Sequence, residues 1–342
     1  MILLKYLGYI LAFLMIITVI FMYKKPIPVD VVDARYTSPS SQFLMMENGS
    51  RIHYRDEGNR QGKIIVLLHG SSASLHTWEP WVELLGDEFR IITLDLPGHG
   101  LTGAVPDNDY TTDAYIKVLD AVVHHLAVPE FVLGGNSMGG QVSWRYTLAH
   151  PGKVTALILV DAMGLSEWWL ESQNSETGKP DSRPMVFQLL AQPWFGAIAM
   201  RLDTYYLVKW GVEAAYNNSP VVTDDLIMRY YELALRKGTR AATMTRFSYS
   251  EQNFSQTYDL SLIARPTLII WGEEDSFIPV SIASKFEQAL PNAVLVTFSG
   301  VGHIPMEEIP EESANTVAEF MHSLSPKTYT QTTDTIEEVG EQ

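Results

Sequence analysis

Short apolar runs alternate with amphipathic stretches along most of this 342-residue chain. Residues 64–68 form an unbroken apolar run, which is typical of a strand buried on both faces of a sheet. From Tyr115 to Leu126, apolar residues recur at three- and four-residue steps, as in an amphipathic helix. Further apolar runs lie at 90–94, 131–134, 157–160, 267–271 and 294–298, and a helical pattern closes the series near 311–324. The alternation predicts an α/β fold with a mostly parallel, doubly wound sheet.

The spacing of these runs also predicts the domain organisation. The alternation covers residues 42–162 and 266–325, and we expect these two parts to form one core domain. Near its start, Asn48-Gly49 is typical of a β-hairpin turn. Residues 163–265 have helical spacings without a convincing buried strand, which predicts an inserted helical cap or lid. Residues 26–41 are expected to be a linker, and the polar, acidic tail at 326–342 is expected to be disordered.

The amino-terminal segment is the least polar part of the chain. Residues 6–23 contain no charge, and 18 helical residues span about 27 Å, close to the hydrocarbon core of a bilayer. The alternative is a cleaved signal peptide, but the run ends in Tyr23-Lys24-Lys25-Pro26 without a small-x-small cleavage site. We therefore expect residues 1–25 to be a single-pass membrane anchor, while the side of the membrane that holds the rest of the chain stays open.

Charge and cysteine content exclude several functions. The chain has 40 acidic against 24 basic residues, a formal charge of −16, so binding to nucleic acid is not expected. It has no cysteine, which excludes disulfides, thiolate metal sites and a cysteine nucleophile. No metal, organic cofactor or obligate protein partner is implied.

A serine lies at the turn that a nucleophile requires. Gly135-Asn136-Ser137-Met138-Gly139 fits G-x-S-x-G, with a predicted strand before it and a predicted helix after it. The turn strains the serine backbone, and small residues two positions away avoid a clash. The serine hydroxyl would then stand clear of the sheet at a helix amino terminus, where negative charge is favoured. We therefore predict Ser137 to be the nucleophile.

A serine nucleophile needs a base, and the base needs an orienting acid. His303 follows the last predicted strand and Asp275 the penultimate one, so both should lie at the sheet edge that carries Ser137. The other histidines considered for the base are expected to have structural roles; they are His53, His124, His125 and His150. Three acidic residues are weaker candidates for the orienting acid because of their positions along the chain; they are Glu273, Glu274 and Asp161.

The tetrahedral intermediate of acyl transfer needs two convergent backbone N–H groups. One is expected from Met138, directly after the nucleophile. The other is expected from the loop after residues 64–68, with Ser71 as the first choice. We expect His69 to hold that loop and not to transfer protons.

These motifs together resemble the α/β-hydrolase superfamily over roughly residues 42–324. They are HG at 69–70, DLPGHG at 95–100, GNSMGG at 135–140, WGEED at 271–275 and VGH at 301–303. The resemblance implies a serine hydrolase with Ser137, Asp275 and His303 as its triad and the amides of Ser71 and Met138 as its oxyanion hole. Serine as nucleophile differs from the epoxide hydrolase and haloalkane dehalogenase branches, which use aspartate.

Three branches are similar to this chain: membrane-anchored monoacylglycerol lipases, small bacterial lipases and esterases, and the carbon–carbon hydrolases of meta-cleavage products. The last usually have tryptophan after the catalytic histidine, where this chain has Ile304. A tethered enzyme meets amphiphilic substrates at high local concentration, so we expect the substrate to be a small-molecule ester or lipid with an apolar acyl chain. The alternatives are a carbon–carbon hydrolase, transacylation, or a non-catalytic hydrolase-fold scaffold.

Aromatic residues of the cap are expected to form an apolar wall above Ser137. The predicted substrate-binding residues are Trp168, Trp169, Trp194, Phe195 and Trp210. Packing within the cap is the competing interpretation for each of them. Arg183 and Arg201 are candidates for contact with a charged head group of the substrate, and an ordinary surface position is the competing interpretation for both.

Overall fold

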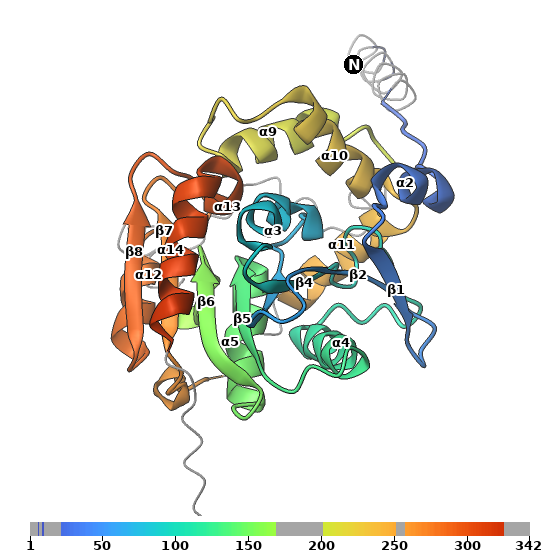
Figure 1. Ribbon diagram of the computed structural model, residues 1–342. Coiled ribbons are helices and arrows are strands. Elements are labelled where there is room, and N and C mark those ends of the chain that lie inside the picture. The colour runs from blue at the N-terminus through green and yellow to red at the C-terminus, as the bar shows by residue number, and fades with distance from the viewer. Residues whose placement is uncertain (1–5, 7–8, 10–21, 169–200, 251–256, 325–342) are drawn as a thin grey trace, which may run out of the picture.

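The computed structural model describes residues 6, 9, 22–168, 201–250 and 257–324, and its centre is an eight-stranded sheet (Figure 1). The strands are β1 (Ser41–Met45), β2 (Arg51–Gly58), β3 (Ile64–Leu68), β4 (Arg90–Leu94), β5 (Phe131–Asn136), β6 (Val154–Val160), β7 (Thr267–Gly272) and β8 (Ala293–Phe298). Their order is β1-β2-β4-β3-β5-β6-β7-β8; β2 pairs antiparallel with β1 and β4, and every other pair is parallel. The predicted mostly parallel α/β sheet is confirmed.

Helices cover both faces of the sheet because its central strands are apolar on both sides. Val66 and Leu68 of β3 pack with residues of α4 and α5, whereas Ile65 and Leu67 pack with residues of α3 and α14. The helices are α3 (Glu79–Leu85), α4 (Thr112–His125), α5 (Met138–Ala149), α12 (Ser281–Ala289), α13 (Pro305–Glu308) and α14 (Pro310–Ser323), with a 3-10 turn at Leu75–Trp78. Full burial of one such aliphatic side chain stabilises the fold by about 1.5–3 kcal/mol.

The described part of the cap contains α9 (Tyr205–Ala215), α10 (Asp224–Leu235), α11 (Thr239–Ser250) and a 3-10 turn at Leu260–Leu262. Figure 1 shows α9 and α10 above the sheet, on the side to which the arrows of β5 to β8 point. The cap meets the core where the His303 N–H donates to the Ala215 carbonyl at 2.7 Å. The predicted acidic tail, 326–342, lies outside the described residues.

The predicted linker, 26–41, differs from its expected form. It contains α2 (Val29–Tyr36), which packs against the cap: Val32 is buried with Leu233, and Arg236 pairs with Asp33 at 3.0 Å. The Ile27 N–H also donates to the Leu235 carbonyl at 2.9 Å. Little in the local sequence indicates this helix, because α2 has only a weakly apolar face and its contacts with the cap are long-range.

Within the described residues, none of the helices has both the length and the apolar character needed to cross a bilayer. The predicted anchor falls almost entirely outside these residues, since only positions 6, 9 and 22–25 of it are described.

Candidate active site

Ser137 lies at the turn between β5 and α5, in a backbone conformation that serine rarely adopts. Its φ is 54° and its ψ is −118°, which is a strained conformation for a residue with a side chain. The strain is held by hydrogen bonds at both peptide groups: its N–H donates to the Val160 carbonyl at 3.0 Å, and its carbonyl accepts from the Met163 N–H at 3.0 Å. A Cβ on Gly135 would lie 2.3 Å from the Gly139 backbone, so this turn requires glycine.

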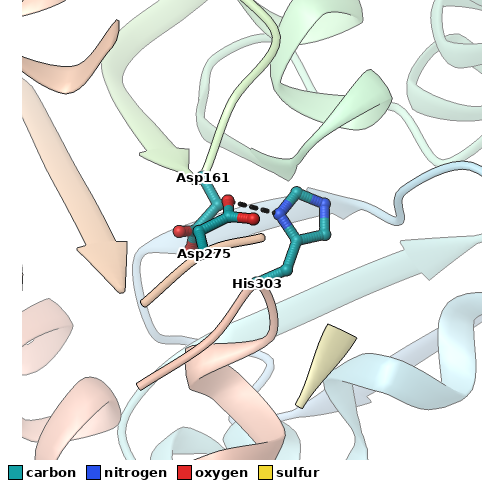
Figure 2. A group of neighbouring side chains, drawn as sticks. All are labelled: Asp161, Asp275 and His303. Carbon is teal, nitrogen blue, oxygen red and sulfur yellow. Dashed lines mark hydrogen bonds and ion pairs between the residues drawn. The ribbon is translucent and has the colours of Figure 1, made fainter. Parts of the chain in front are cut away.

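His303 and Asp275 form a hydrogen-bonded pair at the same sheet edge. His303 Nδ1 lies 2.6 Å from Asp275 Oδ2, and the Asp275 side chain is fully buried (Figure 2). A carboxylate can only accept here, so Nδ1 carries the proton and Nε2 is left with a lone pair. Phe277 packs edge-on against the imidazole, with ring centroids 5.4 Å apart. The structure therefore brings the predicted base and the predicted acid together.

Two polar groups fix the loop that carries His303. The Asn136 amide donates from Nδ2 to the His303 carbonyl at 3.0 Å, which joins this loop to the residue preceding Ser137. The buried Glu308 carboxylate accepts from the Gly302 N–H at 2.9 Å. Burial raises the pKa of Glu308. Neither residue was singled out from the sequence for this role, because each acts through contacts that only the folded chain creates.

Of the weaker acid candidates, only Asp161 lies beside the pair. Its carboxyl oxygen, one from Asp275 and His303 Nδ1 or Nε2 all lie within 4.8 Å of one another (Figure 2). Glu273 instead accepts from the Thr297 hydroxyl at 2.8 Å in an exposed position, and Glu274 is exposed. These three side chains include the kinds of groups that bind metal ions, but Asp275 Oδ2 and His303 Nδ1 are hydrogen-bonded to each other at 2.6 Å.

The two predicted oxyanion donors lie on segments that pack directly together. A Cβ on Gly139 would lie 2.2 Å from the Leu68 carbonyl oxygen, and a Cβ on Gly70 would lie 3.1 Å from Ser137 Cβ. Among the described residues, the N–H groups of Ser71 and Met138 donate to no protein acceptor. Both amides are thus available to an oxygen bound beside Ser137.

His69 holds the loop after β3, as predicted. Its Nε2 accepts from the Leu96 N–H at 3.0 Å, and its Nδ1 donates to the Gly70 carbonyl at 2.7 Å. The neighbouring loop is organised by Asp95, which is fully buried and accepts from His53 Nδ1 at 2.7 Å. Burial alone would raise the pKa of Asp95, but the hydrogen bond from His53 lowers it below its ordinary value.

Arg246 of α11 is a residue that sequence reasoning did not single out. Its Nη1 lies 3.6 Å from Met138 Sδ, while its buried Nε and Nη2 have no hydrogen-bond partner within the described structure. Burial and the Arg246 charge together lower the pKa of His99 well below its ordinary value. An unpaired buried guanidinium is costly, so a bound anion would stabilise it.

The structure describes two of the five predicted wall residues. Trp168 packs edge-on against Phe286, with ring centroids 5.1 Å apart, and belongs to the core cluster around α12. Trp210 lies on α9 with 61% of its surface exposed. The other three, Trp169, Trp194 and Phe195, lie outside the described residues, as does Arg183, while Arg201 is exposed. The substrate-binding role of the five aromatic residues stays a prediction.

A mostly parallel sheet of this order, with a strained serine after β5 and an acid–histidine pair after β7 and β8, defines an α/β-hydrolase. The chain belongs to the alpha/beta hydrolase fold family, whose sequence profile matches residues 63–310. It is a hydrolase of this fold, as the sequence motifs predicted.

Similar proteins include the uncharacterized hydrolase YugF of Bacillus subtilis strain 168, which is 28% identical over 83% of this chain and 98% of its own length. The 2-hydroxy-6-oxo-6-(2'-aminophenyl)hexa-2,4-dienoic acid hydrolase of Metapseudomonas resinovorans is 28% identical over 80% of this chain and 88% of its own. Among solved structures, a membrane phospholipase A described as a bacterial virulence factor has a TM-score of 0.66. It is 22% identical and covers 94% of this chain and 96% of its own.

Proposed function

We propose that this protein is a serine hydrolase that cleaves carboxylic esters with an apolar acyl chain. The observation that carries the proposal is the strained Ser137, at one sheet edge with the 2.6 Å pair of His303 and Asp275. Strain of this kind is stored at functional sites, and a strained serine between a strand and a helix is typical of the nucleophile of an α/β-hydrolase.

The proposed reaction runs through an acyl-enzyme. The Ser137 hydroxyl oxygen attacks the ester carbonyl while His303 Nε2 takes its proton. The oxyanion accepts hydrogen bonds from the N–H groups of Ser71 and Met138, and His303 then gives the proton to the departing alcohol. Water next loses a proton to His303 and attacks the acyl carbonyl carbon. Breaking of the bond between Ser137 Oγ and the acyl group releases the carboxylic acid, and His303 returns the proton to Ser137 Oγ. Asp275 keeps the imidazole in the tautomer that these steps need.

The test is Ser137→Ala, assayed with p-nitrophenyl butyrate on purified protein. Loss of the nucleophile should lower kcat by about 10⁴-fold or more. Ser261→Ala is the matched control, because Ser261 is exposed on a 3-10 turn and, within the described residues, its hydrogen bonds are to the nearby Asp259. Equal turnover by the two variants would refute the assignment.

A carbon–carbon hydrolase is the second candidate, and two observations favour it. A relative that is 28% identical carries the name of a dienoic acid hydrolase. The Arg246 guanidinium, whose Nε and Nη2 have no hydrogen-bond partner among the described residues, would suit a substrate carboxylate. Against it, Ile304 follows His303. Comparison of kcat/KM for short esters, monoacylglycerols and a vinylogous diketone acid distinguishes the two, since the second candidate requires preference for the diketone. A scaffold without catalysis would turn over none of them.

We also propose that residues 6–23 anchor the protein in a membrane and that α9 faces the lipid. Residues directly after the anchor bind the cap: the Lys24 N–H donates to the Arg201 carbonyl at 2.8 Å. Tyr206, Leu207 and Trp210 lie on one side of α9 and are 82%, 54% and 61% exposed. Aromatic and aliphatic residues of this kind favour the bilayer interface.

Because the chain has no cysteine, one engineered cysteine gives a single labelling position. Trp210→Cys is labelled with an environment-sensitive fluorophore in full-length protein reconstituted into lipid vesicles. Val294→Cys is the control, since Val294 is 57% exposed near the start of β8, at the sheet edge opposite the cap. The proposal expects blue-shifted emission and quenching by lipid-borne nitroxides for Trp210→Cys alone. Equal spectra from the two positions would contradict it.

A further inference from the structure

Asp161 is a buried carboxyl group that the proposed reaction does not use. It follows β6 directly, its side chain is fully buried, and its φ of 43° is unusual for a residue other than glycine. One oxygen, Oδ1, accepts from the Gly272 N–H at 2.9 Å. The other, Oδ2, is buried without a hydrogen-bond partner within the described structure. A buried oxygen left in this state is costly unless it carries a proton that it can donate.

The obvious acceptor for such a proton is Asp275. Its Oδ1 accepts from the N–H groups of Phe277 and Ile278 at 2.7 and 3.0 Å, and its Oδ2 accepts from His303 Nδ1. These three hydrogen-bond donors all stabilise the ionised form of Asp275. Figure 2 shows the Asp161 and Asp275 carboxyl groups beside each other with the imidazole next to them. Two adjacent buried carboxyl groups do not both ionise readily, so they share one proton.

We propose that Asp161 keeps its proton in the working enzyme and donates it from Oδ2 to the Asp275 carboxylate, as a positioning residue behind the Asp275–His303 pair. The group that stays ionised is Asp275, because it receives two backbone N–H bonds and the imidazole N–H, whereas Asp161 receives one. The inference rests on the proposed function, since it assigns His303 the role of base.

Charges around Asp161 agree with this distribution of protons. The acidic groups that face it are Asp275, from the loop after β7, and Glu308, from α13. Burial, and then the Asp275 charge, raise the pKa of Asp161 well above its ordinary value. His303 is the basic group of the cluster, and its imidazole bonds to Asp275. A neutral Asp161 leaves one negative charge, that of Asp275, next to the imidazole. One charge stabilises the imidazolium that forms during the reaction, whereas two would keep the base protonated.

Two variants separate a neutral Asp161 from a charged one. Asp161→Asn keeps an acceptor for the Gly272 N–H and a donor for Asp275, and asparagine tolerates a positive φ. It should therefore retain kcat within about threefold and leave the acidic limb of the kcat/KM profile within about 0.3 pH units of the wild type. Asp161→Gly relieves the backbone strain but removes the donor, and should lower kcat by about tenfold or more through a misplaced imidazole.

The decisive measurement does not depend on turnover. The low-field proton NMR signal of the His303 Nδ1–H, identified by its loss in His303→Ala, is titrated in the wild type and in Asp161→Asn. Equal midpoints support a neutral Asp161. A midpoint about one pH unit lower in Asp161→Asn would overturn the proposal, because it would mean that a negative charge had been removed. Wild-type kcat in Asp161→Gly would also overturn it. Failure of the serine-hydrolase proposal would instead appear as a Ser137→Ala variant with unchanged turnover.

Discussion

Replacing Gly139 by alanine adds one methyl group where α5 meets the loop after β3. The added Cβ would lie 2.2 Å from the Leu68 carbonyl oxygen and 2.6 Å from that of His69. Ordinary contacts of a Cβ begin near 3.4 Å. Both obstacles are backbone atoms and cannot rotate away, so the β3 loop and the start of α5 must separate by about 1 Å. These two segments carry the proposed oxyanion donors, Ser71 and Met138.

A displacement of this size has a calculable effect on both stability and rate. Overpacking costs about 1–3 kcal/mol, and the higher helix propensity of alanine returns up to about 1 kcal/mol. The net loss of up to about 3 kcal/mol should lower Tm by up to about 6 °C. A misplacement of about 1 Å among the catalytic groups should lower kcat/KM by about 10²-fold. The loss in rate should thus be much larger than the loss in stability would suggest.

Gly211→Ala is the matched control for this prediction. Gly211 also lies inside a helix, α9, but a Cβ there would meet nothing within 4 Å. Alanine should therefore raise stability by up to about 1 kcal/mol and leave hydrolysis of a soluble ester unchanged. The assays are thermal unfolding by circular dichroism and turnover of p-nitrophenyl butyrate at saturating and limiting concentrations. If Gly139→Ala retains wild-type kcat/KM and Tm, the packing described between α5 and the β3 loop is wrong.

Two further predictions concern buried ionisable groups. Burial raises the pKa of Glu307 to about 7, although its Oε1 accepts from the Thr77 hydroxyl at 2.5 Å. The folded state therefore holds a proton that the unfolded chain has lost above about pH 4.5. The free energy of unfolding should fall by up to about 3 kcal/mol as pH rises from about 4.5 to 7 and then level off, and urea unfolding should show a flatter pH dependence in Glu307→Gln. A steeper dependence would contradict this. Arg246→Met removes a buried charge whose Nε and Nη2 have no hydrogen-bond partner among the described residues, and it should raise stability by about 1–3 kcal/mol, measured by thermal unfolding. Arg90→Met, which breaks a pair with Asp56 at 2.8 Å, should lower Tm, and a fall in both variants would mean that Arg246 has a partner.

Most of what the sequence predicts about the site concerns residues that directly follow the carboxyl ends of strands. Parallel strands bring their carboxyl ends to one edge, so the order of apolar runs places Ser137 after β5, Asp275 after β7 and His303 after β8 at the same edge, while the G-x-S-x-G motif selects the serine. The pairing of His303 with Asp275 instead of Glu273 or Glu274 depends on side-chain direction within one loop, which position along the chain predicts only coarsely.

Groups that act across the fold were beyond the reach of pattern reasoning. Arg246 approaches Met138 from a helix 108 residues further along the chain, and Asn136 bonds a carbonyl 167 residues away. The neutral state proposed for Asp161 arises from burial beside Asp275, which no local signal reports. Helix α2 was missed for the same reason, because its partners on the cap lie about 200 residues downstream.

The central claim is that Ser137 is an activated nucleophile, and covalent labelling tests it most directly. The full-length protein is treated with a fluorophosphonate probe, and the modified residue is identified by peptide mass spectrometry, with Ser137→Ala as the control. The account predicts a single phosphonylated residue, Ser137, with no labelling in the variant and slower labelling when His303 is replaced. A folded wild-type protein that remains unlabelled, or that is labelled at another residue, would contradict it.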